Sequence, residues 1–370
     1  MTSPSSRPDW VPPEAGAEFA TRVVAGTPAR AVPGAQRKRR GPDDVPALAA
    51  AIRTGDRGAL ARGITLIESR AVTHRAAADE LLRTLSPHSG GAVRVGITGP
   101  PGAGKSTFID ALGTLLCTAG KKVAVLSVDP SSPITHGSIL GDKARMEKLS
   151  RQPNAFIRPS PSGCELGGVA RRTRETIVLC EAAGFDVVVV ETVGVGQSEV
   201  LVRGMVDCFL VLLLAGAGDE LQGIKKGIIE LADVLAVNKA DGDNRTRAEA
   251  ARREFSRALH YLAAPEGAWQ PPVLACSAYT NEGVPEVWAA VERFVAYARG
   301  QGSFELRRRE QALAWLEALV DEGLREAFAA QPAAARLRRE LAQQVASGQL
   351  PAPTAARQLL AAAGMTQPSA

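Results

Sequence analysis

The sequence predicts an α/β protein whose mostly parallel β-sheet is flanked by helices, with a small helical extension before this domain and a helical arm after it. Two observations lead to this prediction. Between residues 93 and 298, short β-branched runs alternate with longer stretches of helical periodicity, as in consecutive strand–helix units. Hydrophobic residues make up 45% of the chain and aromatic residues 4%, so the core has to be built from Ala, Val, Leu and Ile.

Six apolar runs account for the expected strands. They lack a strict alternation of polar and apolar residues, which is typical of strands that are buried on both faces of a sheet. The runs cover residues 93–98, 123–128, 187–190, 209–214, 234–237 and 273–276. We assign these strands, and the helices between them, to one domain over residues 91–299.

The segment before this domain has two parts. Residues 1–44 are rich in Pro, Ser, Ala and Gly without sustained periodicity, which predicts a disordered tail. Residues 45–90 are expected to form a helical extension, in which Leu60, Ile64 and Ile67 make an apolar stripe after the candidate N-cap Asp56. A second helix is expected to carry Leu81, Leu82 and Leu85.

Residues 300–370 are expected to form a helical arm, broken into helices at Pro332 and Pro351. An apolar stripe follows one face of the first helix. Such a stripe has to be buried against the parent domain or against a second copy of the chain, and we favour a homodimer because the arm is long and follows a glycine hinge. The stripe consists of Leu313, Leu316, Val320, Leu324 and Phe328.

Charge and cysteine content exclude several classes of protein. The net charge of +5 includes a run of four positive residues, Arg37 to Arg40, which we interpret as solvated charge in the tail and not as a nucleic-acid contact. The 5 cysteines are odd in number and widely spaced, so neither a disulfide framework nor a thiolate metal site is expected. The sequence has no secretory signal and no membrane-spanning stretch, and Asp9, Glu14 and Glu18 argue against a transit peptide, so a cytoplasmic protein is expected.

A phosphate-binding loop follows the first expected strand and opens a helix. Its glycines let successive backbone N–H groups point at phosphates, and the helix dipole adds to the attraction. Lys105 is expected to reach the β and γ phosphates, and the Ser106 hydroxyl to bind Mg²⁺. The nucleotide-binding residues predicted here are Gly99, Pro100, Pro101, Gly102, Ala103, Gly104, Lys105, Ser106 and Thr107.

Acidic residues at strand ends predict the rest of a Mg²⁺ site. Glu191 ends the strand that starts at residue 187, and Mg²⁺ prefers such carboxylate oxygens. Gly194, three residues later, is placed to sense the γ-phosphate through its N–H. Asp129 follows the strand 123–128 and is also expected near the metal, whereas the position of Asp142 gives it no such support.

The choice of base is predicted by Asn238-Lys239-Ala240-Asp241 at the end of the strand 234–237. The Asp241 carboxylate can accept hydrogen bonds from guanine N1–H and the exocyclic amine, and a site built for such a group rejects an analogue without it by roughly 10⁴-fold. The Lys239 stem is expected to cover the ring, and Asn238 to tie this loop to the phosphate-binding loop. Ser277-Ala278, after the next strand, are expected to contact the base carbonyl through the backbone. The sequence therefore predicts binding of GTP and GDP.

Hydrolysis needs a water held in line with the γ-phosphate. Apolar Val195 stands directly after Gly194, where a Ras-like enzyme has a water-orienting Gln, and Gln197 lies two residues further on. We therefore expect slow intrinsic turnover that a partner or a moving loop accelerates. Candidate donors of positive charge are Arg145, Arg174, Lys225 and Lys226.

Longer strings resemble one family, the methylmalonyl-CoA mutase-associated GTPases, or MeaB/ArgK group of SIMIBI-class P-loop GTPases. The likeness spans about residues 48 to 330 and is carried by the segments 55–69, 99–102, 128–132, 137–143, 158–161, 191–199 and 218–227. It implies a dimeric GTPase that assists an adenosylcobalamin-dependent acyl-CoA mutase, gates cofactor delivery from a cobalamin adenosyltransferase and helps to clear inactivated cofactor.

The resemblance also implies roles for individual residues. Asp129, Asp142 and Glu191 would be magnesium and switch residues. The segment 222–226, which contains Lys225, would be an additional switch loop that couples hydrolysis to the partner. Lys105, Glu191, Gln197 and Lys225 are therefore the catalytic residues that we predict.

Three other functions remain as alternatives. A P-loop kinase or ATPase linked to amino-acid transport is disfavoured by the base motif at Asn238 to Asp241. A nickel-insertion GTPase would need Cys and His ligands near its switches, and His136 and Cys164 are isolated in the sequence. A nucleic-acid binder would rest on Arg37 to Arg40 alone. The sequence lacks an Asp-x-His-x-x-Gly cobalamin signature, so the mutase would be a separate chain.

Overall fold

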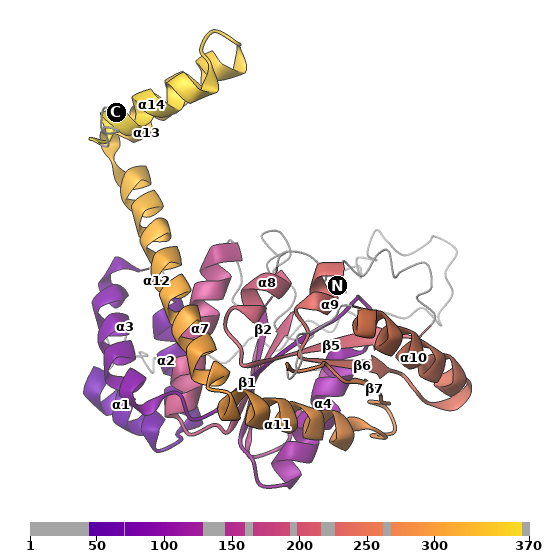
Figure 1. Ribbon diagram of the computed structural model, residues 1–370. Coiled ribbons are helices and arrows are strands. Elements are labelled where there is room, and N and C mark those ends of the chain that lie inside the picture. Colours follow the sequence, from indigo (N-terminus) through magenta and orange to yellow (C-terminus); the bar gives the residue numbers. More distant parts are fainter. Residues whose placement is uncertain are drawn as a thin grey trace, which may run out of the picture. The chain divides into compact units, whose positions relative to one another are not determined.

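A parallel sheet forms the centre of the protein (Figure 1). The computed structural model describes residues 44–69, 71–128, 145–159, 166–192, 198–215, 226–261 and 268–364. The sheet has 7 strands in the order β3-β2-β4-β1-β5-β6-β7, and all neighbouring strands are parallel. The strands are β1 (Val93–Thr98), β2 (Val123–Val128), β3 (Ala155–Arg158), β4 (Val187–Thr192), β5 (Cys208–Leu214), β6 (Val234–Asn238) and β7 (Val273–Ala275).

The predicted fold class is confirmed. Two expected strands, β1 and β2, have the predicted ends, while β4, β5 and β6 are one or two residues longer and β7 is one residue shorter. Strand β3, at the edge of the sheet, was not expected, because its apolar run is short and Pro159 follows it. The sequence thus located the buried strands better than the edge strand.

Helices cover both faces of the sheet because successive side chains of each strand point to opposite sides. Val188 and Val190 of β4 face one cluster of buried side chains, and Val187 and Val189 face the other. The first cluster is completed by α1 (Val45–Arg53), α2 (Arg57–Glu68), α3 (Val72–Leu85), α7 (Leu166–Ala182), α8 (Ser198–Arg203), α9 (Lys226–Glu230) and α10 (Arg245–Tyr261). The second cluster is completed by α4 (Lys105–Thr118), α6 (Glu147–Ser150) and α11 (Val284–Gly300).

The helical extension before the sheet consists of three helices, α1 to α3, where two were expected. The Asp56 side chain caps α2 by accepting a hydrogen bond of 2.9 Å from the Ala59 N–H. Leu60, Ile64 and Ile67 are all buried. The apolar stripe predicted for this helix packs against α7, so the extension forms a further layer on one face of the sheet.

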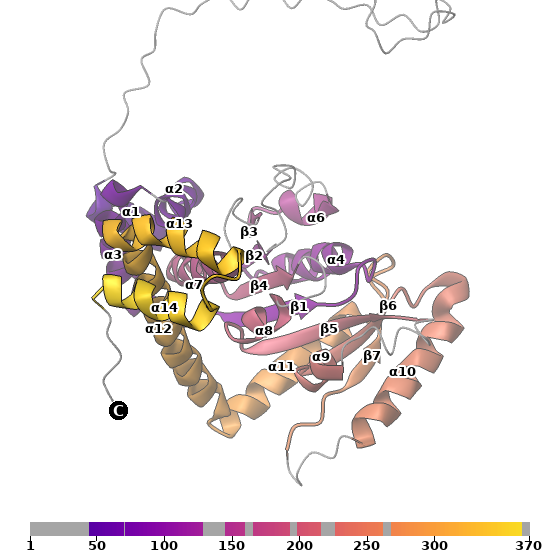
Figure 2. The same ribbon diagram turned by 90° about the horizontal axis from the view of Figure 1, so that it is seen from above.

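The arm after the sheet consists of α12 (Ser303–Ala330), α13 (Pro332–Ala346) and α14 (Ala352–Ala362). Pro332 occupies the first position of α13, and Pro351 precedes α14, as the sequence predicts. Helices α13 and α14 pack side by side (Figure 2). No helix among the described residues has the length and apolar character that crossing a membrane requires.

The carboxyl ends of the parallel strands meet at one edge of the sheet. Thr98, Val128, Thr192, Leu214 and Asn238 end β1, β2, β4, β5 and β6. Ligands of open α/β sheets bind at this edge, so it is where the candidate site has to be sought.

Candidate nucleotide-binding site

The loop between β1 and α4 has a conformation that requires glycine at two places. Gly99 has a φ of 153°, and a Cβ atom there would lie 2.2 Å from the carbonyl oxygen of Leu212. Gly104 has a φ of 82°, and a Cβ atom there would lie 2.8 Å from Nδ2 of Asn238. Both positions bring the loop against neighbouring strands more closely than any other residue type allows.

Lys105 begins α4 and folds back over this loop. Its Nζ donates hydrogen bonds to the carbonyl oxygens of Gly99, at 2.8 Å, and Pro100, at 3.3 Å. Burial lowers the pKa of Lys105, while the nearby carboxylates Glu191 and Glu199 raise it. A phosphate oxygen at the loop would offer this ammonium group a charged acceptor in place of two neutral carbonyls.

Ser106 and Glu191 meet at the ends of α4 and β4. The Ser106 hydroxyl donates a hydrogen bond of 2.9 Å to Oε1 of Glu191, whose side chain is buried at 4% exposure. A hydroxyl and a carboxylate are hard oxygen donors of the kind that Mg²⁺ prefers, so this pair fits one magnesium ion beside the phosphates. Asp129 and Asp142, the other predicted ligands, lie outside the described residues.

Asn238 joins three parts of the site. Its Nδ2 donates to the carbonyl oxygen of Ala103 in the phosphate-binding loop, at 2.8 Å, and its Oδ1 accepts from the Ala278 N–H, at 3.0 Å. The side chain is 1% exposed. These bonds fix the loop after β6 against both neighbouring loops, as a base-recognition loop requires.

The loop after β6 is held in a strained conformation. Lys239 has a φ of 60°, which is uncommon for a residue with a side chain, and its carbonyl oxygen accepts from Asn244 Nδ2 at 2.7 Å. The Ala240 N–H donates to the carbonyl oxygen of Cys276 at 3.0 Å. Lys239 is exposed and Asp241 is half-buried. The loop therefore presents an aliphatic stem and a carboxylate from a fixed backbone.

The turn after β7, where Ser277 and Ala278 are predicted to contact the base carbonyl, already has both of these amides in hydrogen bonds. The Ser277 N–H donates to the Glu282 carbonyl oxygen at 2.8 Å, and the Ala278 N–H donates to Asn238. The next amide, of Tyr279, makes no hydrogen bond to a described residue, and its side chain is 82% exposed. A base carbonyl at this turn has to displace Asn238 from the Ala278 amide or accept from Tyr279, which the sequence did not single out.

The structure rules out Arg174 as a charge donor at the phosphates. Its guanidinium donates to the carbonyl oxygens of Gly204, at 2.9 Å, and Gln311, at 2.8 Å, and lies over the Trp315 ring. It therefore ties α7 to α8 and α12. Of the other candidate charge donors, Arg145 is exposed. Thr107, predicted to bind the nucleotide, is also exposed. Gly194, Gln197, Lys225 and the side chain of Lys226 lie outside the described part of the chain.

Glu199 is a charged residue of this site that the sequence did not assign. It lies in the first turn of α8 and is 1% exposed. Its charge raises the pKa of Lys105, as does that of Glu191. It ends the segment 191–199 that carries the family resemblance, but its proximity to Lys105 depends on how α8 packs and so could not be derived from that string.

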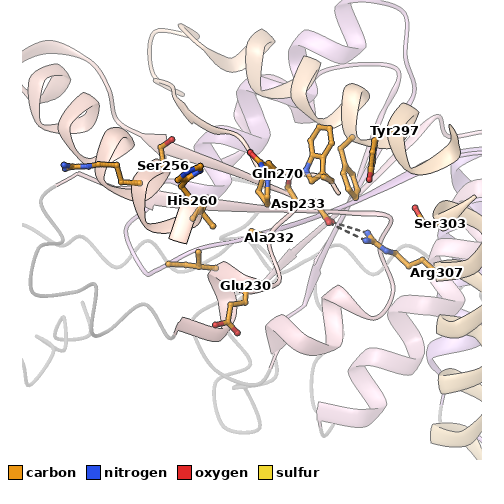
Figure 3. A pocket seen from close by; sticks show the side chains of 15 residues that line it. Glu230, Ala232, Asp233, Ser256, His260, Gln270, Tyr297, Ser303 and Arg307 are labelled. Atoms are coloured by element: carbon orange, nitrogen blue, oxygen red, sulfur yellow. Dashed lines mark hydrogen bonds and ion pairs between the residues drawn. The ribbon is translucent and has the colours of Figure 1, made fainter. Parts of the chain in front are cut away.

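A cavity of about 900 Å³ lies elsewhere in the fold (Figure 3). Its lining includes the side chains of Glu230, His260 and Arg307. Asp233, which directly precedes β6, also lines it. This cavity is at the amino end of β6, the edge opposite to the phosphate-binding loop. It shares no lining residue with the nucleotide site.

The family model described as "Methylmalonyl Co-A mutase-associated GTPase MeaB" matches residues 60–333. The chain belongs to the MeaB family. The match includes the phosphate-binding loop, the Ser106–Glu191 pair and the loop after β6, so the geometry described above is that of a MeaB-family GTPase. This MeaB-family chain is accordingly a GTP hydrolase that binds guanine nucleotide.

Individual relatives agree with this assignment. A probable GTPase of Mycobacterium tuberculosis is 53% identical over 324 residues, which cover 88% of this MeaB-family chain and 96% of the relative. A mitochondrial methylmalonic aciduria type A homolog of Mus musculus is 43% identical over 318 residues, covering 83% and 77%. The crystal structure of an LAO/AO transport system kinase is similar with a TM-score of 0.68 and 42% identity, covering 85% and 96%.

Proposed function

We propose that this GTPase is a chaperone for an adenosylcobalamin-dependent acyl-CoA mutase such as methylmalonyl-CoA mutase, and that its GTP cycle gates the loading and reactivation of the mutase cofactor. The observation that carries the proposal is the match of residues 60–333 to a family described as mutase-associated. A cobalamin adenosyltransferase, as the source of cofactor, is a second proposed partner.

Each part of the nucleotide-binding site has a proposed role. The amides of the phosphate-binding loop and Lys105 bind the phosphates, and the half-buried carboxylate of Asp241 selects guanine. Ser106 and Glu191 hold Mg²⁺ together with Asp129 and Asp142. When bound, Mg²⁺ neutralises charge on the β and γ phosphates.

Hydrolysis itself is assigned to residues near the γ-phosphate. Gly194 is proposed to sense that phosphate, Gln197 to orient the attacking water and Lys225 to supply positive charge. Because Val195 stands where a Ras-like enzyme has a water-orienting Gln, we propose that turnover is slow until the mutase accelerates it.

A homodimer is supported by the two faces of α12. One face docks on the parent domain through polar contacts, in which Arg171 pairs with Glu322 at 3.5 Å and Arg75 pairs with Glu326 at 3.1 Å. The apolar stripe lies on another face, where no described residue covers it: Leu313, Leu316, Val320 and Leu324 are 48–64% exposed, and Leu306 extends this face at 54%. Docking of the arm on its own domain therefore leaves the stripe available to a second copy.

A cytoplasmic location completes the proposal. Four cysteines, Cys117, Cys180, Cys208 and Cys276, are buried free thiols. Burial raises the pKa of Cys276 to about 12, so this thiol is held in its unreactive neutral form. Free thiols persist in a reducing compartment such as the cytoplasm.

A transport-linked kinase is the alternative suggested by the name of the similar crystal structure. The base loop argues against it, because Asn238 ties this loop to the phosphate-binding loop and the proposed role of the Asp241 carboxylate is to accept hydrogen bonds from protons that guanine has and adenine lacks. Turnover of ATP by the purified protein at a rate comparable to that of GTP would favour the kinase.

The chaperone proposal is tested by adding an adenosylcobalamin-dependent mutase to the purified protein and measuring GTP hydrolysis. We expect the hydrolysis rate to rise at least about tenfold, since activating partners of other GTPases raise this rate by several orders of magnitude. A mutase with a denatured cobalamin domain serves as the control. Equal hydrolysis with the intact mutase, the control and no added protein would contradict the proposal.

A further inference from the structure

A buried pair of threonine hydroxyls lies directly beneath the nucleotide site. The Thr192 hydroxyl donates a hydrogen bond of 2.8 Å to Oγ1 of Thr98, and both side chains are 0% exposed. Thr98 is the last residue of β1, and Thr192 is the last residue of β4. Each hydroxyl therefore ends a strand that leads into a functional segment.

The pair sits where the two strands part. Backbone pairing of β1 with β4 ends at Ile97 and Glu191. One residue further, Thr98 pairs with Val211 of β5, and Thr192 pairs with Val128 of β2. At this level each strand keeps only its pairing with its other neighbour, and the Thr98–Thr192 hydrogen bond links β1 and β4 through side chains where their backbone pairing has ended.

Residues that act on the nucleotide adjoin both threonines. Gly99 directly follows Thr98 and is pressed against the Leu212 carbonyl of β5, so the start of the phosphate-binding loop has little freedom to shift. Glu191 directly precedes Thr192, and its carboxylate accepts the Ser106 hydroxyl at 2.9 Å. The distance between Glu191 and the phosphate-binding loop consequently depends on how far apart the ends of β1 and β4 lie.

We propose that the Thr98–Thr192 hydroxyl pair positions the Glu191 carboxylate against Ser106, so that both oxygen groups meet one magnesium ion. The two threonines are positioning residues, since neither touches the nucleotide. The inference rests on the proposed magnesium role of Ser106 and Glu191. Separating the two strand ends would leave two buried hydroxyls without hydrogen-bond partners, which costs about 1–3 kcal/mol for each group and so opposes the separation.

The variant Thr192→Val tests the proposal, because valine has nearly the shape of threonine without its hydroxyl. We measure the binding of a fluorescent GTP analogue at increasing Mg²⁺, and without Mg²⁺. The Mg²⁺ concentration for half-maximal binding should rise about tenfold, because the free energy of one lost hydrogen bond corresponds to about a tenfold change in an equilibrium constant. Affinity without Mg²⁺ should change less than about twofold, and Thr192→Ser should restore the wild-type Mg²⁺ dependence.

A matched control separates positioning from stability. Thr173 in α7 is also buried, and its hydroxyl donates to the Val169 carbonyl oxygen at 2.8 Å, away from the site. Thr173→Val should lower the thermal unfolding temperature without altering the Mg²⁺ dependence. If Thr192→Val shows the same pattern as Thr173→Val, the hydroxyl pair is structural only and the inference is wrong.

Two further variants keep the test decisive. If Thr192→Val does not fold, the double variant Thr98→Val/Thr192→Val is used, which leaves no orphaned hydroxyl and should share the raised Mg²⁺ requirement. Ser106→Ala and Glu191→Gln probe the magnesium site itself. If neither changes the Mg²⁺ dependence, the proposed magnesium role fails. If both change it and the threonine variants do not, the positioning role alone fails.

Discussion

At the scale of single residues, the surroundings of Lys105 change its pKa, and this change should affect nucleotide binding. Burial lowers its pKa from the usual 10.5, and a bound phosphate has to raise it again. Nucleotide binding is therefore linked to proton uptake once the pH exceeds the lowered pKa, so nucleotide affinity should fall as the pH rises toward 10.5. Fluorescence titrations between about pH 7.5 and pH 10 measure this fall.

Lys105→Arg is the matched control for this prediction. A guanidinium stays charged throughout that pH range, so the variant should bind more weakly but with little dependence on pH. An identical loss of affinity in the wild type and in Lys105→Arg would show that another group titrates.

The start of the phosphate-binding loop allows a second prediction, in which two glycines with positive φ are compared. Gly99→Ala brings a Cβ atom against the Leu212 carbonyl oxygen, whereas Gly102→Ala, at a φ of 79°, meets nothing within 4 Å. Both variants carry backbone strain of about 1 kcal/mol, but the first must also displace a strand. Nucleotide affinity should fall at least about 100-fold for Gly99→Ala and about fivefold or less for Gly102→Ala. Equal losses would mean that strain, and not the close approach, governs the loop.

At the scale of elements, the start of α12 is fastened to the amino ends of β1 and β5. Arg308 pairs with Asp207 at 2.6 Å and donates to the carbonyl oxygens of Gly90 and Ala92. The Asp207 side chain is 1% exposed, so removal of Arg308 leaves a buried carboxylate without its charged partner.

Arg308→Ala should therefore destabilise the protein by about 3–5 kcal/mol. Arg309→Ala, at an exposed neighbour, should change stability by less than about 0.5 kcal/mol. Denaturant unfolding of both variants measures the difference. Comparable stabilities would mean that α12 is not held by this ion pair.

Elements differ in how well the sequence revealed them. Strand β1 was located to the residue, because its β-branched residues lead directly into the glycine-rich phosphate-binding loop, which marks the end of the strand. Strand β3 was missed because four residues at the sheet edge give no period. Site residues differ in the same way. Lys105 and Asp241 have roles that local motifs predict, whereas the proximity of Glu199 to Lys105 and of Thr192 to Thr98 arises only when distant segments pack together.

At the scale of the whole molecule, the uncovered stripe of α12 predicts how the oligomer is held. Leu316→Glu with Val320→Glu would place two charges in a dimer interface and remove two apolar contacts worth about 1.5–3 kcal/mol each. The dimer dissociation constant should rise by at least about 100-fold, as measured by sedimentation velocity. Arg325→Glu, at an exposed position of the same helix that points away from the stripe, should leave it nearly unchanged.

A wild-type protein that sediments as a monomer at micromolar concentration would contradict the proposed dimer. A double variant that dissociates while its thermal unfolding remains cooperative would instead show that the stripe acts between copies and not within one chain.

The most direct test of the whole account is the base preference of Asp241→Asn. An amide cannot accept both guanine protons, but it can donate to the second carbonyl of xanthine, so the variant should prefer xanthosine over guanosine triphosphate by about 100-fold or more. Competitive binding of the two nucleotides to the wild type and the variant measures this switch. A variant that still binds the guanine nucleotide more tightly would show that Asp241 does not choose the base.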